Sequence, residues 1–424
     1  MERGKIMSDT NFKLSPIITR SFDKGVLKKF LSKYRLRTEF ERSNKEFHDF
    51  VQDYIAKGDI RISELEEYFN EELLYGNQRS IYMHEIYGNY RKTQSKQALL
   101  NRIQERYPYV ESLKFHSVLQ QPLNKEITEL VSIKAEVGFE VAIVQRITLI
   151  FGEKCYVNLK DGYRSEYSYI TIEVDFPKKL LFVKVEPKTG VNDELQKPSN
   201  LAKKYYDIVT KLFKFQYNEY VNLHKATLCN MNIELYNQVY NKMVQKQPEG
   251  ISMYIDSAVK NFQDKLDICN YKEKLAHSSI FNISDILTKM VEHILITDIL
   301  YESAETGILA GVEGYVTYVK FSDGTNISAR IRGEDYIASI FSSEAFMALR
   351  ASINNAKKIT ILKISWLNEY HGTRVSYDAS DNQCLEILLY KHHTKEEFEY
   401  AVRKYRECEA RTIEENPTLV AMEA

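Results

Sequence analysis

The order of hydrophobic and polar residues changes its period three times along the chain. In residues 1–107, apolar residues recur at the three- and four-residue spacing of amphipathic helices, as at Val26, Phe30 and Tyr34. From about residue 128, apolar and polar residues alternate, which is the period of a half-buried strand. Helical spacing returns between about 198 and 306, and alternation returns after 307. The pattern predicts a mixed α+β protein, in which an amino-terminal helical bundle precedes two units of antiparallel sheet with covering helices.

Breaks between these stretches divide the chain into three expected domains and a tail. Gly58 and Gly76-Asn77 interrupt the first helical stretch, and Ser63 with Glu66 has the spacing of a capping box that begins a helix. A compact bundle of three or four helices fits this stretch, and the winged-helix type is one such bundle. The expected parts are a basic helical domain at 1–107, antiparallel sheet plus long helices at 108–306, a carboxy-terminal α+β domain at 307–415 and a tail at 416–424.

Strands are predicted from alternation together with the turn residues between alternating stretches. In the first sheet unit we expect a strand through 131–137 and others near 140–151, 154–159, 167–175 and 180–186. Tight turns are predicted at 151–154 and 160–162, so neighbouring strands should be antiparallel. In the second unit, 315–321 and 326–331 flank a Ser-Asp-Gly-Thr turn and form the clearest hairpin of the sequence.

Two later helices have clear start signals. Ser343 precedes a helix that is expected to end before Lys357. Thr394 with Glu397 forms a second capping box, which is expected to begin the terminal helix of the third domain.

Charge is balanced over the whole chain but not locally. The formal net charge of −1 excludes a uniformly basic, histone-like binder, whereas residues 13–37 hold eight cations and one acid, a local +7. A second cluster between 79 and 102 contains Tyr82, Tyr87 and Tyr90 among its cations, with Glu85 as its one acid. Cations interleaved with aromatic residues suit phosphate contact and base stacking. The predicted nucleic-acid-binding residues are Lys28, Lys29, Lys33, Arg35, Arg37, Arg79, Arg91 and Lys92.

Two other interpretations of the basic stretches stay open. Lysines and arginines also form solvated helical faces beside half-buried tyrosines, without any ligand. An acidic protein partner is the third interpretation, because it would meet the same cations.

One hairpin carries a pattern with catalytic potential. Asp175 ends one predicted strand, and Glu186-Pro187-Lys188 ends the next. An acid followed by acid-x-Lys on the neighbouring strand resembles the active centre of the PD-(D/E)xK nucleases. The resemblance implies that Asp175 and Glu186 hold Mg²⁺ or Mn²⁺ and that Lys188 orients the attacking water. The alternative is an exposed hairpin with alternating charge.

Other chemistry is weakly indicated. The five cysteines include no Cys-x-x-Cys pair, so neither a zinc cluster nor a disulfide framework is predicted, and a reducing cytoplasm is favoured. Gly307, Gly311 and Gly314 lack a following Gly-Lys-Ser/Thr, and His371 with His392-His393 lacks ligand spacing. No signal peptide, membrane-length apolar run, hydrolase motif or dinucleotide fingerprint is present, so no cofactor and no membrane contact are expected.

These observations favour a cytoplasmic, non-enzymatic protein that binds nucleic acid through its basic helical arm. A metal-dependent nuclease centred on Asp175, Glu186 and Lys188 is the first alternative, and a protein-only adaptor or scaffold is the second. The α/β units would then supply surfaces for a protein partner or a homo-oligomer. The abundance of Tyr, Lys, Asn and Ile resembles proteins of AT-rich bacterial genomes, where a host-defence or mobile-element role would fit.

Overall fold

The structure is a computed structural model of the 424-residue chain. The chain forms two compact units: Met1–Glu219 with Glu386–Phe398 (unit 1), and Tyr220–Leu385 with Glu399–Ala424 (unit 2). The domain boundaries expected after 107, 306 and 415 stay predictions. The mixed α+β class, with an amino-terminal helical region and antiparallel sheet, is confirmed. The structure describes residues 12–77, 79–88, 94–119, 129–138, 143–159, 162–188, 190–191, 193–216, 222–266, 283–306, 311–322, 328–333, 338–367 and 372–421.

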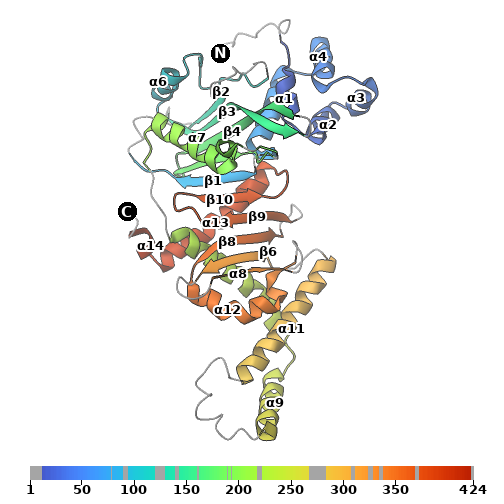
Figure 1. Ribbon diagram of the computed structural model, residues 1–424, viewed down its shortest axis with the longest axis vertical. Coiled ribbons are helices and arrows are strands. Elements are labelled where there is room, and N and C mark those ends of the chain that lie inside the picture. Colours follow the sequence, from blue (N-terminus) through green and yellow to red (C-terminus); the bar gives the residue numbers. More distant parts are fainter. Residues whose placement is uncertain are drawn as a thin grey trace. The chain divides into compact units, whose positions relative to one another are not determined.

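Unit 1 begins with a bundle of short helices (Figure 1). Gly58 adopts a left-handed φ of 83° and ends the fourth helix, as predicted. The capping box is wrong, because the fifth helix begins at Ile62 and its N-cap is Arg61. Phenylalanine rings such as Phe30 and Phe69 form the centre of the bundle core. The helices are α1 (Pro16–Arg20), α2 (Lys24–Lys33), α3 (Arg37–Ser43), α4 (Phe47–Lys57) and α5 (Ile62–Glu71), followed by a π-helical turn, η2 (Glu72–Gly76).

A strand follows where only helix was expected. β1 (Ser80–Glu85) lies within the sheet of unit 1, and its residues pair with a strand about 100 positions later in the chain. The helix that comes next, α6 (Lys96–Arg106), is capped by the hydroxyl of Ser95. Local sequence could not reveal β1, because its alternating partners are distant in sequence.

The sheet of unit 1 has the order β2-β3-β4-β5-β1-β10. Neighbours from β2 to β1 in this order are antiparallel. The predicted turn at 151–154 is wrong, because β3 runs through Gly152 without a break and pairs with β4 from Arg146 to Leu159. The strands are β2 (Glu129–Val137), β3 (Val144–Leu159), β4 (Gly162–Asp175), β5 (Leu180–Val185) and β10 (Leu385–Leu389).

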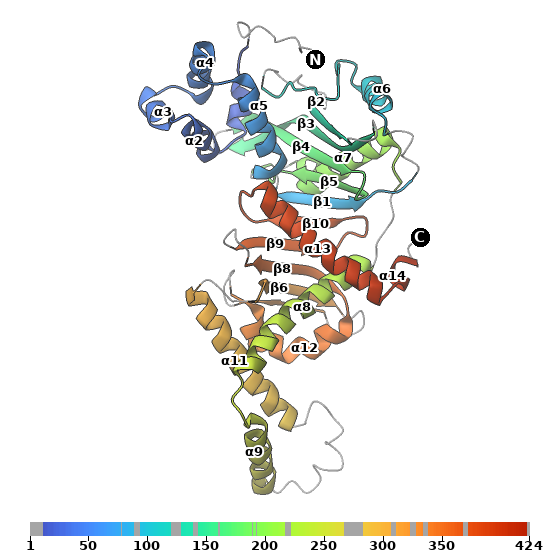
Figure 2. The ribbon, with the colours of Figure 1, turned by 180° about the vertical axis from the view of Figure 1, so that it is seen from behind.

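Helices cover both faces of this sheet. On one face, the ring of Phe151 packs on Tyr205 of α7 (Pro198–Phe213), which follows the short turn η4 (Glu194–Gln196). On the other face, Ile150, Tyr167 and Tyr169 belong to the core of the helical bundle. Figures 1 and 2 show α7 and α5 on opposite sides of the strands.

Unit 2 contains the antiparallel strands β9-β8-β6-β7, in that order, and its own helices. Its strands are β6 (Gly314–Ser322), β7 (Ser328–Arg332), β8 (Ile359–Trp366) and β9 (Thr373–Asp378). Its helices are α8 (Leu223–Lys246), α9 (Ile251–Leu266), α11 (Ile283–Thr306), a 3₁₀ turn η5 (Ile340–Ser342), α12 (Glu344–Ala356) and α14 (Thr418–Ala421). The terminal helix α13 (Lys395–Glu415) begins in unit 1 and continues into unit 2.

Local start signals in and near unit 2 are confirmed. Ser343 caps α12 through its hydroxyl, and the helix ends at Lys357 in a left-handed conformation. Thr394 and Glu397 cap each other's backbone amides at the start of α13. The β6–β7 hairpin is also present, although its predicted turn residues 323–325 lie outside the described residues.

One face of the unit 2 sheet is covered by helices and the other is not. Val319, Leu362 and Tyr377 are buried, and the Tyr377 hydroxyl donates a hydrogen bond to the Ala401 carbonyl of α13 at 3.0 Å. Figure 2 shows α8 and α13 in front of these strands, whereas Figure 1 shows the opposite face without a helix in front of it. Among the described residues, no helix combines the length and apolar character needed to cross a bilayer.

Candidate functional site

The first predicted site residues lie on α2, the turn after it and the start of α3. Val26, Leu27, Phe30 and Leu31 are the buried side of α2. The helical period therefore directs the lysines of α2 away from the bundle core. We define the basic helical surface as the exposed side chains Lys24, Lys29, Lys33, Arg35 and Arg37.

Lys28 differs from its neighbours because it is ion-paired. Its ammonium lies 2.8 Å from a carboxylate oxygen of Glu41, which also accepts from Arg37 at 3.3 Å. The hydrogen bonds from Lys28 and Arg37 hold the pKa of Glu41 below its ordinary value. Lys28 therefore contributes less to an available positive surface than the sequence predicted.

The turn between α2 and α3 fixes the position of Arg35. Its φ of 60° is in the left-handed region, which costs an L-residue about 1 kcal/mol. Backbone hydrogen bonds from Arg35 to Ser32 and from Leu36 to Leu31, at 3.1 and 3.0 Å, hold the turn closed. The guanidinium is therefore carried by a defined backbone turn, not by a loose loop.

Two described members of the second predicted basic cluster contact other parts of unit 1. Arg79 is half-buried and donates to the Tyr390 carbonyl at 3.4 Å, while Tyr82 is only 5% exposed within β1. Arg91 and Lys92 lie outside the described residues. Among the described residues of this cluster, Arg79 and Tyr82 have structural contacts instead of open faces.

The structure does not bring the predicted catalytic carboxylates together. Asp175 lies opposite Leu180 at one end of β5, whereas Glu186 follows Val185 at the other end. Six residues of strand separate them, which is about 20 Å. One cation with ligand distances of about 2.0–2.6 Å cannot bridge that separation.

The ammonium of Lys188 already contacts two groups of β4. Its ammonium donates to the Tyr167 carbonyl at 2.6 Å and lies 3.3 Å from Glu166. Burial raises the pKa of the Glu186 carboxyl, and Lys188 offsets only part of that effect. This hairpin therefore gives the nuclease alternative no geometric support.

A buried ionic network lies in the same sheet and was missed by the sequence analysis. Arg146 of β3 contacts Asp175 at 3.0 Å and Glu173 at 3.5 Å, both on β4. The Glu173 carboxylate in turn lies 3.0 Å from the ammonium of Lys184 on β5. The three adjacent strands thus place cations and carboxylates alternately on one face of the sheet.

Lys184 is enclosed on all sides of this network. Its side chain is 0% exposed, and its ammonium lies 4.2 and 3.9 Å from the ring centres of Tyr75 and Phe398. Burial alone would raise the pKa of Glu173, but Lys184 and Arg146 outweigh burial and lower it. Among the described residues, no group of three or more His, Cys, Asp or Glu side chains is placed to hold a metal ion. The network is therefore a closed structural feature without an open metal position.

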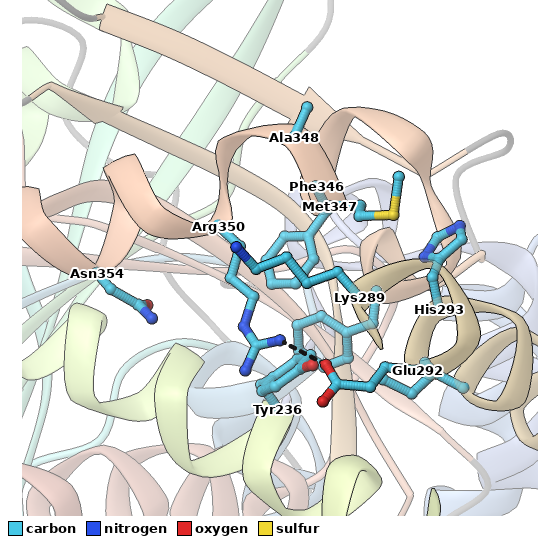
Figure 3. A pocket seen from close by; sticks show the side chains of 11 residues that line it. Tyr236, Lys289, Glu292, His293, Phe346, Met347, Ala348, Arg350 and Asn354 are labelled. Atoms are coloured by element: carbon cyan, nitrogen blue, oxygen red, sulfur yellow. Dashed lines mark hydrogen bonds and ion pairs between the residues drawn. The ribbon is translucent and has the colours of Figure 1, made fainter. Parts of the chain in front are cut away.

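Unit 2 contains a cavity of about 250 Å³ between α8, α11 and α12 (Figure 3). The guanidinium of Arg350 stacks 4.2 Å from the ring centre of Tyr236 and lies 3.4 Å from Glu292. Tyr240 donates to the other oxygen of Glu292 at 3.0 Å. Burial raises the pKa of Tyr236 to about 12, so this phenol stays neutral.

The cavity is smaller than most ligand pockets, and the charged side chains around it are paired with each other. Arg350 is paired with Glu292, and Lys289 lies 2.6 Å from Asp285. The remaining wall is largely apolar, with Phe341, Phe346 and Met347. The arrangement therefore explains helix packing better than selection of a charged ligand.

No protein-family model matches the chain, and no curated protein matches its sequence.

Proposed function

We propose that the protein binds nucleic acid through the basic helical surface of unit 1. The observation that carries the proposal is the absence of acids from the sequence between Lys24 and Lys33 and onward to Arg37, together with the exposure of five cations in that stretch. Phosphate neutralisation by such cations releases counterions and supplies sequence-independent affinity.

The nearby charges support an open surface instead of a network of ion pairs. Within the described residues, Glu41 is the carboxylate that forms ion pairs with cations of this stretch, and these cations are Lys28 and Arg37. Lys33 also lies 4.7 Å from the ring centre of Tyr68, which supports its stem while its side chain stays exposed. Four cations, Lys24, Lys29, Lys33 and Arg35, remain without a carboxylate partner among the described residues.

The test is a binding titration with the full chain. Changing Lys24, Lys29, Lys33, Arg35 and Arg37 together to Gln should weaken binding to unrelated sequences about equally. It should also make the slope of log affinity against log salt concentration less negative by roughly four. Circular dichroism should be unchanged, because exposed charges away from packing contacts have small effects on stability.

A matched pair of variants separates this surface from general charge. Lys29→Gln with Lys33→Gln removes two exposed lysines from α2, and Lys203→Gln with Lys211→Gln removes two from α7 of the same unit. Only the α2 pair should reduce affinity and salt dependence. Equal losses from both pairs would show that net charge, not this surface, controls binding.

A second candidate function is contact with a protein partner, which the apolar surface of two helices favours. Side chains of α9 and α11 that are about half or more exposed are Met253, Tyr254, Phe262, Ile286, Met290, Ile294 and Tyr301. Exposed apolar groups in such number are typical of association surfaces. Light scattering at increasing protein concentration should detect self-association that Met290→Glu removes. A constant monomer mass would leave self-association without support.

A further inference from the structure

The open face of the unit 2 sheet carries an unusual set of side chains. Because directly opposed residues of antiparallel strands share a face, the register aligns Arg332, Tyr318 and Lys363 in one row across β7, β6 and β8. A second row contains Arg330 and Lys320. Arg374 of β9 lies on the same face, opposite Ser365. We call Lys320, Arg330, Arg332, Lys363 and Arg374 the cationic sheet face.

This face is open and nearly free of acid. Lys320, Arg330 and Arg332 are exposed, while Lys363, Arg374 and Tyr318 are half-buried. The one carboxylate that the register places on it is Asp378, which accepts a hydrogen bond from the Ser380 amide at 2.8 Å. Within the described residues, Asp378 is thus the one carboxylate beside the exposed pair Lys320 and Arg330, whereas Arg332 and Lys363 have interactions of their own.

The charges of Lys320 and Arg330 do not stabilise the fold. Lys320 lies directly opposite Arg330, and like charges in directly opposed positions repel each other. Within the described residues, neither side chain forms an ion pair. The apolar side chains that hold these strands, such as Val319 and Ile331, are on the other face. A conflict between local charges without a packing benefit indicates a functional surface.

The shape and chemistry fit one kind of ligand. Cations at alternate positions of a strand lie about 6.6 Å apart, and neighbouring strands are about 4.8 Å apart, so positive charge spreads over a flat area. Tyr318 lies in the middle of this area, with the Lys363 ammonium 5.0 Å from its ring centre. Exposed bases that can stack on a ring occur in single strands, whereas a duplex keeps its bases stacked inside.

We propose that the cationic sheet face binds single-stranded nucleic acid, with Lys320, Arg330 and Arg332 at phosphates and Tyr318 stacked on a base. The inference rests on the proposed function for its class of ligand, but it concerns a different unit and different residues. Each surface is therefore tested by its own substitutions.

The test uses the full chain and a fluorescently labelled single-stranded oligothymidylate of about 20 nucleotides, with a duplex of the same length for comparison. Lys320→Gln, Arg330→Gln and Arg332→Gln together should make the slope of log affinity against log salt concentration for the single strand less negative by about two. Affinity at low salt should fall at least tenfold. A matched control changes Lys260, Lys265 and Lys358, three exposed lysines elsewhere in unit 2, and should have no such effect.

The stacking part of the proposal has its own measurement. Tyr318→Ala should weaken single-strand binding about 5- to 150-fold, whereas Tyr318→Phe should stay within about twofold of the unsubstituted chain. Tyr318→Trp should give fluorescence that the oligonucleotide quenches. The natural Trp366 is 3% exposed and supplies a constant background. Circular dichroism of each variant checks that the sheet is intact.

The outcomes separate this inference from the proposed function. We call the three-site change at Lys320, Arg330 and Arg332 the sheet variant, and the five-site change of the basic helical surface the α2 variant. If the sheet variant loses binding and the α2 variant does not, the inference is supported and the proposal for the basic helical surface is overturned. The reverse result overturns the inference alone. Equal losses for duplex and single strand, or displacement of the oligonucleotide by polyglutamate at equal charge concentration, would also overturn it. If the unsubstituted chain binds no nucleic acid, both proposals fail.

Discussion

Cations occupy one sheet face in each unit, and their surroundings differ. In unit 1, Arg146 and Lys184 alternate with Asp175 and Glu173 across three strands, and Tyr75 of η2 and Phe398 of α13 enclose Lys184. In unit 2, Lys320 lies opposite Arg330, and Asp378 is the one carboxylate that the register adds to the face. The first set of cations has its counter-charges inside the protein. In the second set, Lys320 and Arg330 form no ion pair within the described residues, so a ligand can supply their counter-charges.

The energetic consequences are opposite in the two units. Removing Lys184 from water is costly, and Glu173 together with the rings of Tyr75 and Phe398 offsets that cost only while all are present. Lys320 and Arg330 keep their hydration, so their removal costs the fold little. Substitution of the buried set should therefore destabilise the protein, while substitution of the exposed set should change binding.

The largest expected effect is that of Lys184→Met. The substitution leaves the Glu173 carboxylate buried with Arg146 at 3.5 Å as its remaining cationic partner, which should cost about 3–5 kcal/mol. Lys320→Met should change stability by less than about 0.5 kcal/mol. Urea unfolding followed by circular dichroism measures both. Similar values for the two variants would remove the distinction between paired and unpaired cations.

Adding Glu173→Gln to Lys184→Met sharpens this result. The double variant no longer buries an uncompensated carboxylate, so it should recover part of the stability that the single variant loses. No recovery would mean that Lys184 acts through packing on Tyr75 and Phe398 rather than through its charge.

The second effect is a pH dependence that belongs to unit 1. His393 is 1% exposed, and burial, followed by the charges of Lys184, His392 and Arg79, lowers its pKa to about 3; the Lys391 carbonyl opposes this only in part. The unfolded chain binds a proton near pH 6.5 and the folded chain does not, so stability falls as pH falls from 6.5 towards 3. His393→Leu should flatten that decline by up to about 1.4 kcal/mol per pH unit. Parallel declines for both proteins, measured by urea unfolding between pH 4 and 8, would contradict this assignment.

The smallest expected effect is a gain in stability from Arg330→Glu. The substitution replaces a repulsive cross-strand pair with an attractive one beside Lys320, which should stabilise the protein by about 0.2–1 kcal/mol. The same change should weaken single-strand binding. A variant that is less stable and binds unchanged would show that Arg330 serves the fold after all. Thermal unfolding and fluorescence anisotropy on one protein sample give both values.

Features with local causes were predictable from sequence. The end of α4 at Gly58, the cap at Ser343 and the reciprocal cap of Thr394 with Glu397 each depend on residues within one helical turn. The β6–β7 hairpin followed from alternation around turn residues. Together with the changes of hydrophobic period along the chain, these signals were sufficient for the fold class.

Features that depend on distant pairing were not predictable. Gly152 was predicted to lie in a turn, but β2 and β4 pair with β3 on both sides and keep Gly152 extended. The partner of β1 lies about 100 residues away, so its strand was taken for part of a helical region. The network of Arg146, Glu173 and Lys184 depends on the register of three strands, which no single stretch reveals. For the same reason Asp175 and Glu186 were expected close together.

The most direct test of the account is the salt dependence of single-strand binding to the full chain. The exposed cations of the two surfaces should together give a slope of log affinity against log salt concentration of about −6 or steeper. The α2 variant and the sheet variant should each flatten it, and the α7 control should not. A slope near zero, or one slope shared by all four proteins, would contradict the claim that these cations meet phosphates.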